Sequence, residues 1–168
     1  MKGVYLCARK HRIPGYEIDY NDIVDYPGIN LCCDMLDVDL TYYDFIIATP
    51  PCNYYSRANY RRETSKVAQM TKHLLPSILE KLTKDFKDRP FLVENVCNKT
   101  LLPRVPFVYQ FDYGQHHFYT NVFFWILEEP VKQNKAHVSR NKRDGNKNVD
   151  VVIRSFLERC KDIYGEIS

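Results

Sequence analysis

The sequence predicts a three-layer α/β protein whose sheet has an antiparallel hairpin at one edge. Short apolar runs closed by polar or proline-rich turns alternate with amphipathic stretches, which is typical of strands and helices that share one sheet. Two β-rich runs late in the chain follow each other directly and favour a hairpin. With 168 residues and a hydrophobic share of 45%, the chain can bury a core, and we expect one domain over residues 1–168.

Five short runs are expected to form strands, because each is closed by polar residues or a turn signal: residues 4–7, 16–20, 29–33, 45–48 and 91–93. Residues 22–26 predict a helical turn. Residues 64–83 have helical spacing and predict one helix, which Pro76 is expected to kink. Residues 105–111 and 121–127 predict the hairpin, with 114–117 as its turn. Residues 130–147 predict a loop, and 149–164 the last helix, ended by Gly165.

A proline pair ends the run 45–48 and leads directly to Cys52. Each proline has a fixed φ and no N–H, so the segment is predicted to be a rigid loop. Ligands of α/β sheets bind at the carboxyl ends of strands, where this thiol is expected to lie. The residues alone leave two roles open for Cys52, a small buried side chain or a nucleophile. Glu94 ends the next predicted strand, and it can act there as a proton donor, as a helix cap or as a surface charge.

The composition excludes several classes of protein. The net charge of +3 permits a polyanionic partner without requiring one. The six cysteines form no Cys-x-x-Cys pair, which argues against a zinc site or a disulfide framework, and free thiols suit a reducing compartment. No stretch approaches the ~20 apolar residues of a membrane span. We therefore expect a soluble, cytoplasmic protein with no metal site and no membrane partner.

Basic and aromatic side chains alternate after Cys52. The cations are Arg57, Arg61, Arg62 and Lys66, and they are interleaved with Tyr54, Tyr55 and Tyr60. Cations beside aromatic rings suit the backbone and the bases of a nucleic acid, whereas a solvated surface loop is the ordinary alternative. Given the neighbouring Cys52, the pattern favours contact with DNA.

Two segments resemble the DNA cytosine-C5 methyltransferases. Residues 49–56, Thr-Pro-Pro-Cys-Asn-Tyr-Tyr-Ser, resemble that family's Pro-Cys catalytic motif, and residues 91–96, Phe-Leu-Val-Glu-Asn-Val, resemble its Glu-Asn-Val motif. The resemblance covers about residues 34–96. It implies a Rossmann-like fold that binds S-adenosylmethionine, with DNA as the partner. The small size of the chain suits a phage or a mobile element, which would place it in the cytoplasm of a bacterium or an infected host cell.

The resemblance also implies roles for individual residues. Cys52 would add to C6 of a cytosine, Glu94 would hold and protonate N3, and Asn95 would orient Glu94 and the loop of Cys52. The cofactor would be bound by Asp19 at its ribose and by Asp34 at its adenine amino group, with Pro50 lining the pocket. The residues then expected to contact DNA are Ser56, Arg57, Arg61, Arg62 and Asn121.

The chain departs from the family in three places. No glycine follows the first predicted strand until Gly15, although the family has a glycine-rich loop there. Where the family has arginines that touch the target base, this chain offers Asn121 or one of two histidines, His116 and His117. Only residues 128–147 are available for target recognition, so a partner chain could supply it. Two alternatives stay open: an inactive module that binds DNA or a protein, and an enzyme acting on free cytosine nucleotides.

Overall fold

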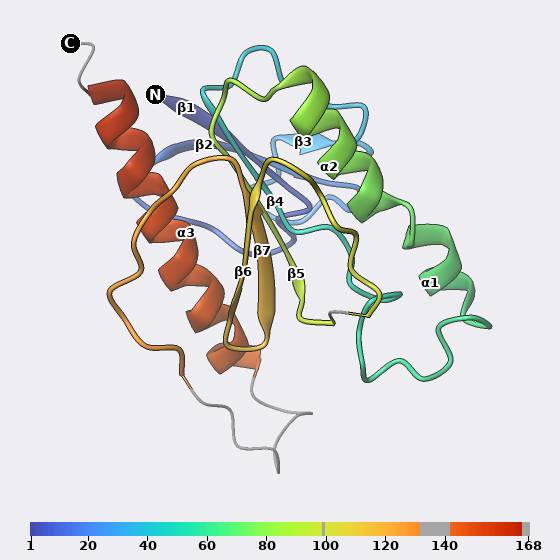
Figure 1. The fold of residues 1–168 in the computed structure, drawn as a ribbon. Coiled ribbons are helices and arrows are strands. Elements are labelled where there is room, and N and C mark those ends of the chain that lie inside the picture. Colours follow the sequence, from blue (N-terminus) through green and yellow to red (C-terminus); the bar gives the residue numbers. More distant parts are fainter. Residues whose placement is uncertain (99, 132–141, 166–168) are drawn as a thin grey trace.

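A computed structural model describes residues 1–98, 100–131 and 142–165, and for 142–146 only the backbone (Figure 1). Seven strands form one mixed sheet in the order β3-β2-β1-β4-β5-β7-β6. The strands are β1 (Lys2–Leu6), β2 (Glu17–Asp22), β3 (Leu31–Cys32), β4 (Phe45–Ala48), β5 (Phe91–Val96), β6 (Tyr109–Tyr113) and β7 (His116–Thr120). The helices are α1 (Lys66–Thr71), α2 (Leu74–Asp85) and α3 (Lys142–Gly165). The predicted α/β sheet with an antiparallel hairpin at its edge is confirmed.

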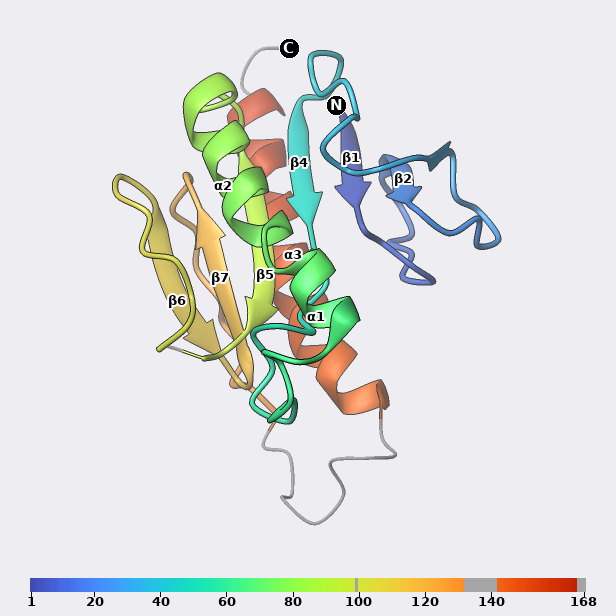
Figure 2. The same ribbon diagram turned by 90° about the vertical axis from the view of Figure 1, so that its right-hand side faces the viewer.

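The first five strands are parallel, and their order reverses between β1 and β4. Gly3 of β1 lies opposite Phe45 of β4, and Ala48 of β4 lies opposite Val93 of β5. The strand β7 runs antiparallel between β5 and β6. Figure 2 shows the arrowheads of β1, β4 and β5 pointing to the same edge of the sheet. Ligands of such sheets bind at this edge, where the strand order reverses.

Helices cover both faces of the sheet, which confirms the predicted three layers. The helices α1 and α2 lie on one face and α3 on the other (Figures 1 and 2). Leu75, Ile78, Leu79 and Leu82 of α2 pack against one set of alternate strand residues. Val152, Phe156 and Leu157 of α3 pack against the other set. Strand residues alternate between the faces, so neighbouring side chains contribute to different cores.

Aromatic packing fixes α3 on the sheet. The Phe156 ring is fully buried and meets the rings of Phe45 at 6.4 Å and Phe124 at 6.0 Å, both edge to face. Such pairs add about 0.5–1.5 kcal/mol to the effect of burial alone. Gly3 makes room for this cluster, because a Cβ there would lie 2.1 Å from the Phe45 ring.

The single helix predicted over 64–83 is wrong, because the chain forms two helices. Ser65 caps α1 by accepting a hydrogen bond from Ala68 N, and α1 ends before Lys72. Pro76 is the third residue of α2. A proline is tolerated in the first turn of a helix, where its missing N–H has no intrahelical partner to lose. The proline therefore stands near the start of a new helix and does not kink a continuous one.

The predicted bounds of the hairpin are also wrong. Its strands are β6 and β7, and its two-residue turn contains Gly114 at φ +63°. A positive φ at this position suits tight hairpin turns. His116 and His117 consequently lie in β7 and not in a turn. Residues 121–127 do alternate, with Val122, Phe124 and Ile126 packed against the core, but they belong to no strand in the part of the chain described here.

Three smaller expectations are corrected as well. The second strand continues to Asp22, since Asn21 and Asp22 pair with β3, and the helical turn predicted at 22–26 is absent. The last helix starts at Lys142, so the end of the loop predicted over 130–147 is helical, and residues 132–141 of that loop lie outside the described residues. Over the described ranges, no helix combines the length and the apolar character needed to cross a bilayer.

Candidate active site at the carboxyl edge of the sheet

Cys52 lies in a tightly turned loop that follows β4. Ser56 N donates to Cys52 O at 2.8 Å, and Asn59 Nδ2 donates to Asn53 O at 2.7 Å. Asn98 Nδ2, from beyond β5, donates to Tyr55 O at 2.8 Å. These bonds hold the segment after Pro51 in one shape, as the two prolines predict. The Cys52 side chain is half-buried at this edge.

Asn95 connects β5 to the loop of Cys52. Its side chain is buried, Nδ2 donates to Pro50 O at 3.1 Å, and Oδ1 accepts from Val96 N at 3.0 Å. The register of β4 and β5 places these groups side by side. A buried amide with both ends bonded fixes its partners in position. The expected link between Asn95 and the Cys52 loop is therefore present, and Pro50 is itself buried.

Glu94 points to the other face of β5 and meets His116 of β7. Glu94 Oε1 lies 2.6 Å from His116 Nδ1, and the two side chains are 14% and 18% exposed. Glu94 is paired with a base, so it serves neither as a helix cap nor as an exposed charge. The sequence predicted no partner for Glu94, and the pairing of β5 with β7 is what brings His116 to it.

The charge of Glu94 affects the pKa of the Cys52 thiol. Burial raises the pKa of the Cys52 thiol, the negative charge of Glu94 raises it further, and the Arg9 guanidinium opposes both effects. The Glu94 carboxylate therefore acts on the ionisation of the Cys52 thiol. A thiol with a raised pKa is mainly protonated at neutral pH, so a reaction must favour its ionisation.

The loop after β1 adopts a backbone conformation that usually needs glycine. Cys7 has φ +56° and Arg9 has φ +51°. Ala8 N donates to Asn21 O and Arg9 N to Asp22 Oδ2, both at 2.9 Å. Left-handed conformations of residues other than glycine cost about 1–2 kcal/mol each. They persist where surrounding bonds enforce them, and they cluster at functional sites.

Asp19, which the resemblance assigns to the cofactor ribose, does not lie at the end of the second strand. Asp19 lies inside β2, and its carboxylate accepts from Lys2 Nζ at 2.8 Å and from Tyr43 Oη at 3.0 Å. Asp22 is the acidic residue at the end of β2, where its two oxygens accept from Arg9 N and Val24 N. Asp34 follows β3 as expected, and its Oδ1 accepts from Leu36 N at 2.9 Å.

The basic segment after Cys52 has two kinds of arginine. Arg57 and Arg61 are exposed, and the Arg61 guanidinium lies 5.4 Å from the ring centre of Tyr60, which is 84% exposed. Arg62 instead turns inward and donates to Ser56 O at 3.0 Å. Its Nε is buried and has no hydrogen-bond partner among the described residues. Arg62 therefore supports the loop that carries Ser56, which corrects its predicted place on the DNA-facing surface.

Asn121, which was predicted to contact DNA beside the target base, lies away from this edge of the sheet. Its Nδ2 donates to Lys87 O and Arg89 O, both at 2.8 Å, and its Oδ1 accepts from Phe91 N at 2.9 Å. Phe91 begins β5, whereas Glu94 lies near its end. The predicted strand 121–127 starts where β7 in fact ends, so Asn121 lies beyond the hairpin.

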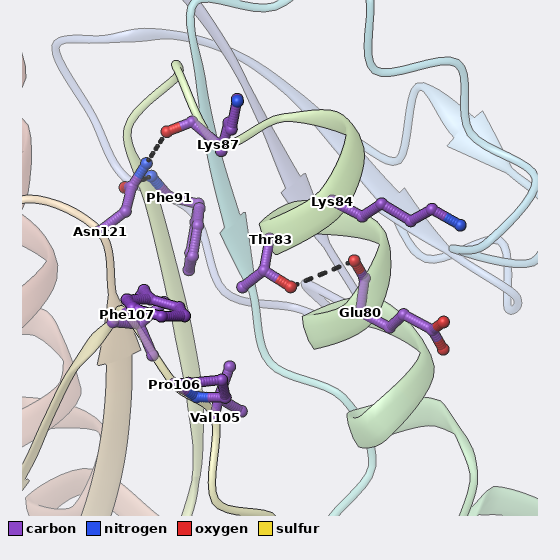
Figure 3. Close-up of a pocket in the computed structure, with 10 residues that line it drawn as sticks. Glu80, Thr83, Lys84, Lys87, Phe91, Val105, Pro106, Phe107 and Asn121 are labelled. Atoms are coloured by element: carbon purple, nitrogen blue, oxygen red, sulfur yellow. Dashed lines mark hydrogen bonds between the residues drawn. The ribbon is translucent and has the colours of Figure 1, made fainter.

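A hollow of about 410 Å³ lies at the opposite end of β5, between α2 and residues 105–108 (Figure 3). Phe91 and Asn121 line it, so it is remote from Cys52 and Glu94. Within the described residues, no group of three or more His, Cys, Asp or Glu side chains could hold a metal ion. Comparison with protein-family models, with curated proteins and with solved structures finds no match for this chain.

Proposed function

We propose that this protein is a DNA cytosine-C5 methyltransferase that uses S-adenosylmethionine and forms a covalent adduct through Cys52. One observation carries the proposal: Cys52 and Glu94 both lie at the carboxyl ends of neighbouring parallel strands, at the edge where the strand order reverses, and Asn95 bonds β5 to the loop of Cys52. The order β3-β2-β1-β4-β5 with an antiparallel edge agrees with the Rossmann-like fold that the two motifs imply.

The residues at this edge fit the cofactor. Cys7 and Arg9 take the left-handed conformation at a Gly-x-Gly spacing, so the loop keeps the backbone path that the family's glycines allow. Asp22 ends β2 and Asp34 follows β3 at the same edge, where carboxylates can accept from ribose hydroxyls and an adenine amino group. Asp22 replaces Asp19 in this role, and buried Pro50 would line the pocket.

Each side chain has a distinct task in the reaction. The Cys52 sulfur, after losing its proton to solvent, forms a bond to C6 of cytosine, and the C5–C6 π electrons shift through C5 and C4 to N3. Glu94 donates a proton to N3 and neutralises the charge that develops there. When bound, the cofactor supplies the methyl group that C5 takes up. Loss of the C5 proton to water then lets the thiolate leave, and N3 returns its proton to Glu94.

The substrate must bring its base to this edge. In duplex DNA the cytosine would leave the stack to reach Cys52. Arg57, Arg61 and the exposed Tyr60 lie on the same loop and suit the backbone and bases of the strand. A partner chain could provide the choice of target sequence.

Covalent trapping tests the proposal. A 5-fluorocytosine oligonucleotide with S-adenosylmethionine should give a protein–DNA adduct that resists denaturation, because fluorine blocks the final loss of a proton from C5. Cys52→Ala should abolish the adduct, whereas Cys32→Ala, which changes an exposed cysteine, should leave it intact. If wild-type protein forms no adduct, or forms it equally without Cys52, the proposed reaction is wrong.

A second function has its own support. The N–H groups of Cys7, Ala8 and Arg9 all donate to Asn21 or Asp22, so they are already engaged without a cofactor. This favours a module that binds DNA and performs no methyl transfer. Calorimetry with S-adenosylmethionine separates the two functions: no binding at millimolar cofactor, together with a DNA gel shift that is unchanged in Cys52→Ala, supports the module.

A further inference from the structure

We propose that this protein pairs with a second copy of itself about a twofold axis, and that Phe107 of each copy fills the hollow of the other. The hollow is the one between α2 and residues 105–108, at the end of β5 opposite to Cys52. The inference is independent of the proposed reaction, because the hollow and Phe107 lie away from Cys52.

Phe107 is held outside the core by an unusual backbone conformation. Its side chain is fully exposed, and its φ is +63°. The left-handed conformation costs a residue other than glycine about 1–2 kcal/mol, and it is a rare exception for a bulky side chain. Such strain persists where the surrounding structure enforces it, and it clusters at functional sites. An exposed aromatic ring at a strained position therefore indicates a contact with another molecule.

The hollow beside Phe107 has the size and the lining to receive such a ring. Its volume of about 410 Å³ lies within the range of about 300–1,000 Å³ that holds drug-sized ligands, so it has room for a phenyl ring. The fully buried Phe91 and the half-buried Val105 line it, and Thr83 of α2 faces Phe107 and Pro106 across it (Figure 3). Because ring and hollow are neighbours on one surface, a twofold axis between them makes both contacts at once.

The charges around the hollow favour a second copy over a partner of one charge sign. The rim has one carboxylate, Glu80, and two ammonium groups, Lys84 and Lys87, all of them exposed. A rim with both signs can pair with itself, since the twofold axis can bring Glu80 of one copy to a lysine of the other. A polyanion such as DNA would meet Glu80, and the exposed Asp85 and Asp88 on the same part of the chain oppose it further.

An aromatic strip continues from Phe107 along the same surface. Tyr109, Phe123 and Trp125 are 52%, 52% and 75% exposed. Their rings meet edge to face, with centres 5.8 Å apart for Tyr109 and Phe123 and 5.0 Å apart for Phe123 and Trp125. Contiguous exposed apolar patches mark interaction sites. Trp125 is the single tryptophan of the chain, so its fluorescence reports whether a second copy covers the strip.

Sedimentation velocity and Trp125 fluorescence over a wide range of protein concentration test the pairing. Wild-type protein should change from monomer to dimer as concentration rises, and the Trp125 emission should shift to shorter wavelength in parallel. Phe107→Gly removes the ring and suits the positive φ, so the fold should be kept. Its dissociation constant should rise by at least about 100-fold, because two anchoring rings are lost per dimer. Met70→Gln, which changes another exposed apolar side chain on α1, should keep the wild-type constant.

Charge reversal tests the geometry of the pair. Glu80→Lys leaves a rim with positive charges only, and Lys84→Glu with Lys87→Glu leaves one with negative charges only. Each variant alone should self-associate more weakly than wild type, whereas an equimolar mixture should form the heterodimer. Wild-type protein that stays monomeric at every concentration, or a dimer that survives Phe107→Gly, would overturn the proposal. So would a mixture of the charge variants that associates no better than either variant alone.

Discussion

The buried amide of Asn95 gives the sharpest test of how the site is held. Asn95→Asp keeps the shape of the side chain but replaces the Nδ2 donor with an oxygen that faces Pro50 O, 3.1 Å from the original nitrogen. Asn95 is 1% exposed, so an ionised carboxylate there would be buried without a partner. Such a group costs about 3–5 kcal/mol. When protonated, the introduced carboxyl can donate to Pro50 O, and most of the loss is recovered.

The sign of the pH dependence follows from this protonation. The folded state raises the pKa of the introduced carboxyl above its unfolded value of about 3.9. Its stabilising, protonated form is present at low pH and is lost as pH rises towards the folded pKa. Relative to wild type, destabilisation should grow by about 1.4 kcal/mol per pH unit, or about 2.7 kcal/mol between pH 5 and pH 7.

Urea unfolding at these two pH values measures the difference. Asn59→Asp is the control: Asn59 Nδ2 donates to Asn53 O within the same loop but near the surface, so this change should cost under about 1 kcal/mol at both pH values. Equal destabilisation of Asn95→Asp at pH 5 and pH 7, or none, would refute the bond between Asn95 and Pro50.

Three further predictions concern charge and packing. Glu94→Gln removes the carboxylate charge that raises the pKa of Cys52, so alkylation of Cys52 at pH 8 should accelerate; an unchanged or slower rate would contradict their proximity. Arg57→Gln with Arg61→Gln should weaken DNA binding and reduce the salt dependence of log K by about 0.9 for each phosphate that is no longer neutralised, and an unchanged slope would remove both from the interface. Phe156→Ala should lower the free energy of unfolding by about 3–5 kcal/mol in urea titrations, while a decrease under about 1 kcal/mol would show that α3 is not anchored by this ring.

Local patterns predicted the elements that carry strong signals. The apolar run 45–48 and the Pro-Pro pair specify a buried strand and a rigid loop through properties of those residues themselves. The same holds for Phe91–Val93, which lies inside β5. The predicted ends of elements were wrong where contacts with other segments determine them. At Asp22, for example, pairing with β3 extends β2 beyond its predicted end. Pro76 is ambiguous in the sequence because the same residue can kink one helix or stand in the first turn of another.

The sequence by itself determined that Cys52 follows one buried strand and that Glu94 lies towards the end of another, because apolar runs and prolines act locally. Only the tertiary structure decided which side chains lie next to them. Strand pairing, which joins residues far apart in the chain, brought His116 to Glu94 and His117 to Asp112. It also placed Asp22 at the end of β2. Cys7 and Arg9 adopt the left-handed conformation because hydrogen bonds to β2 enforce a backbone shape that neither residue prefers alone.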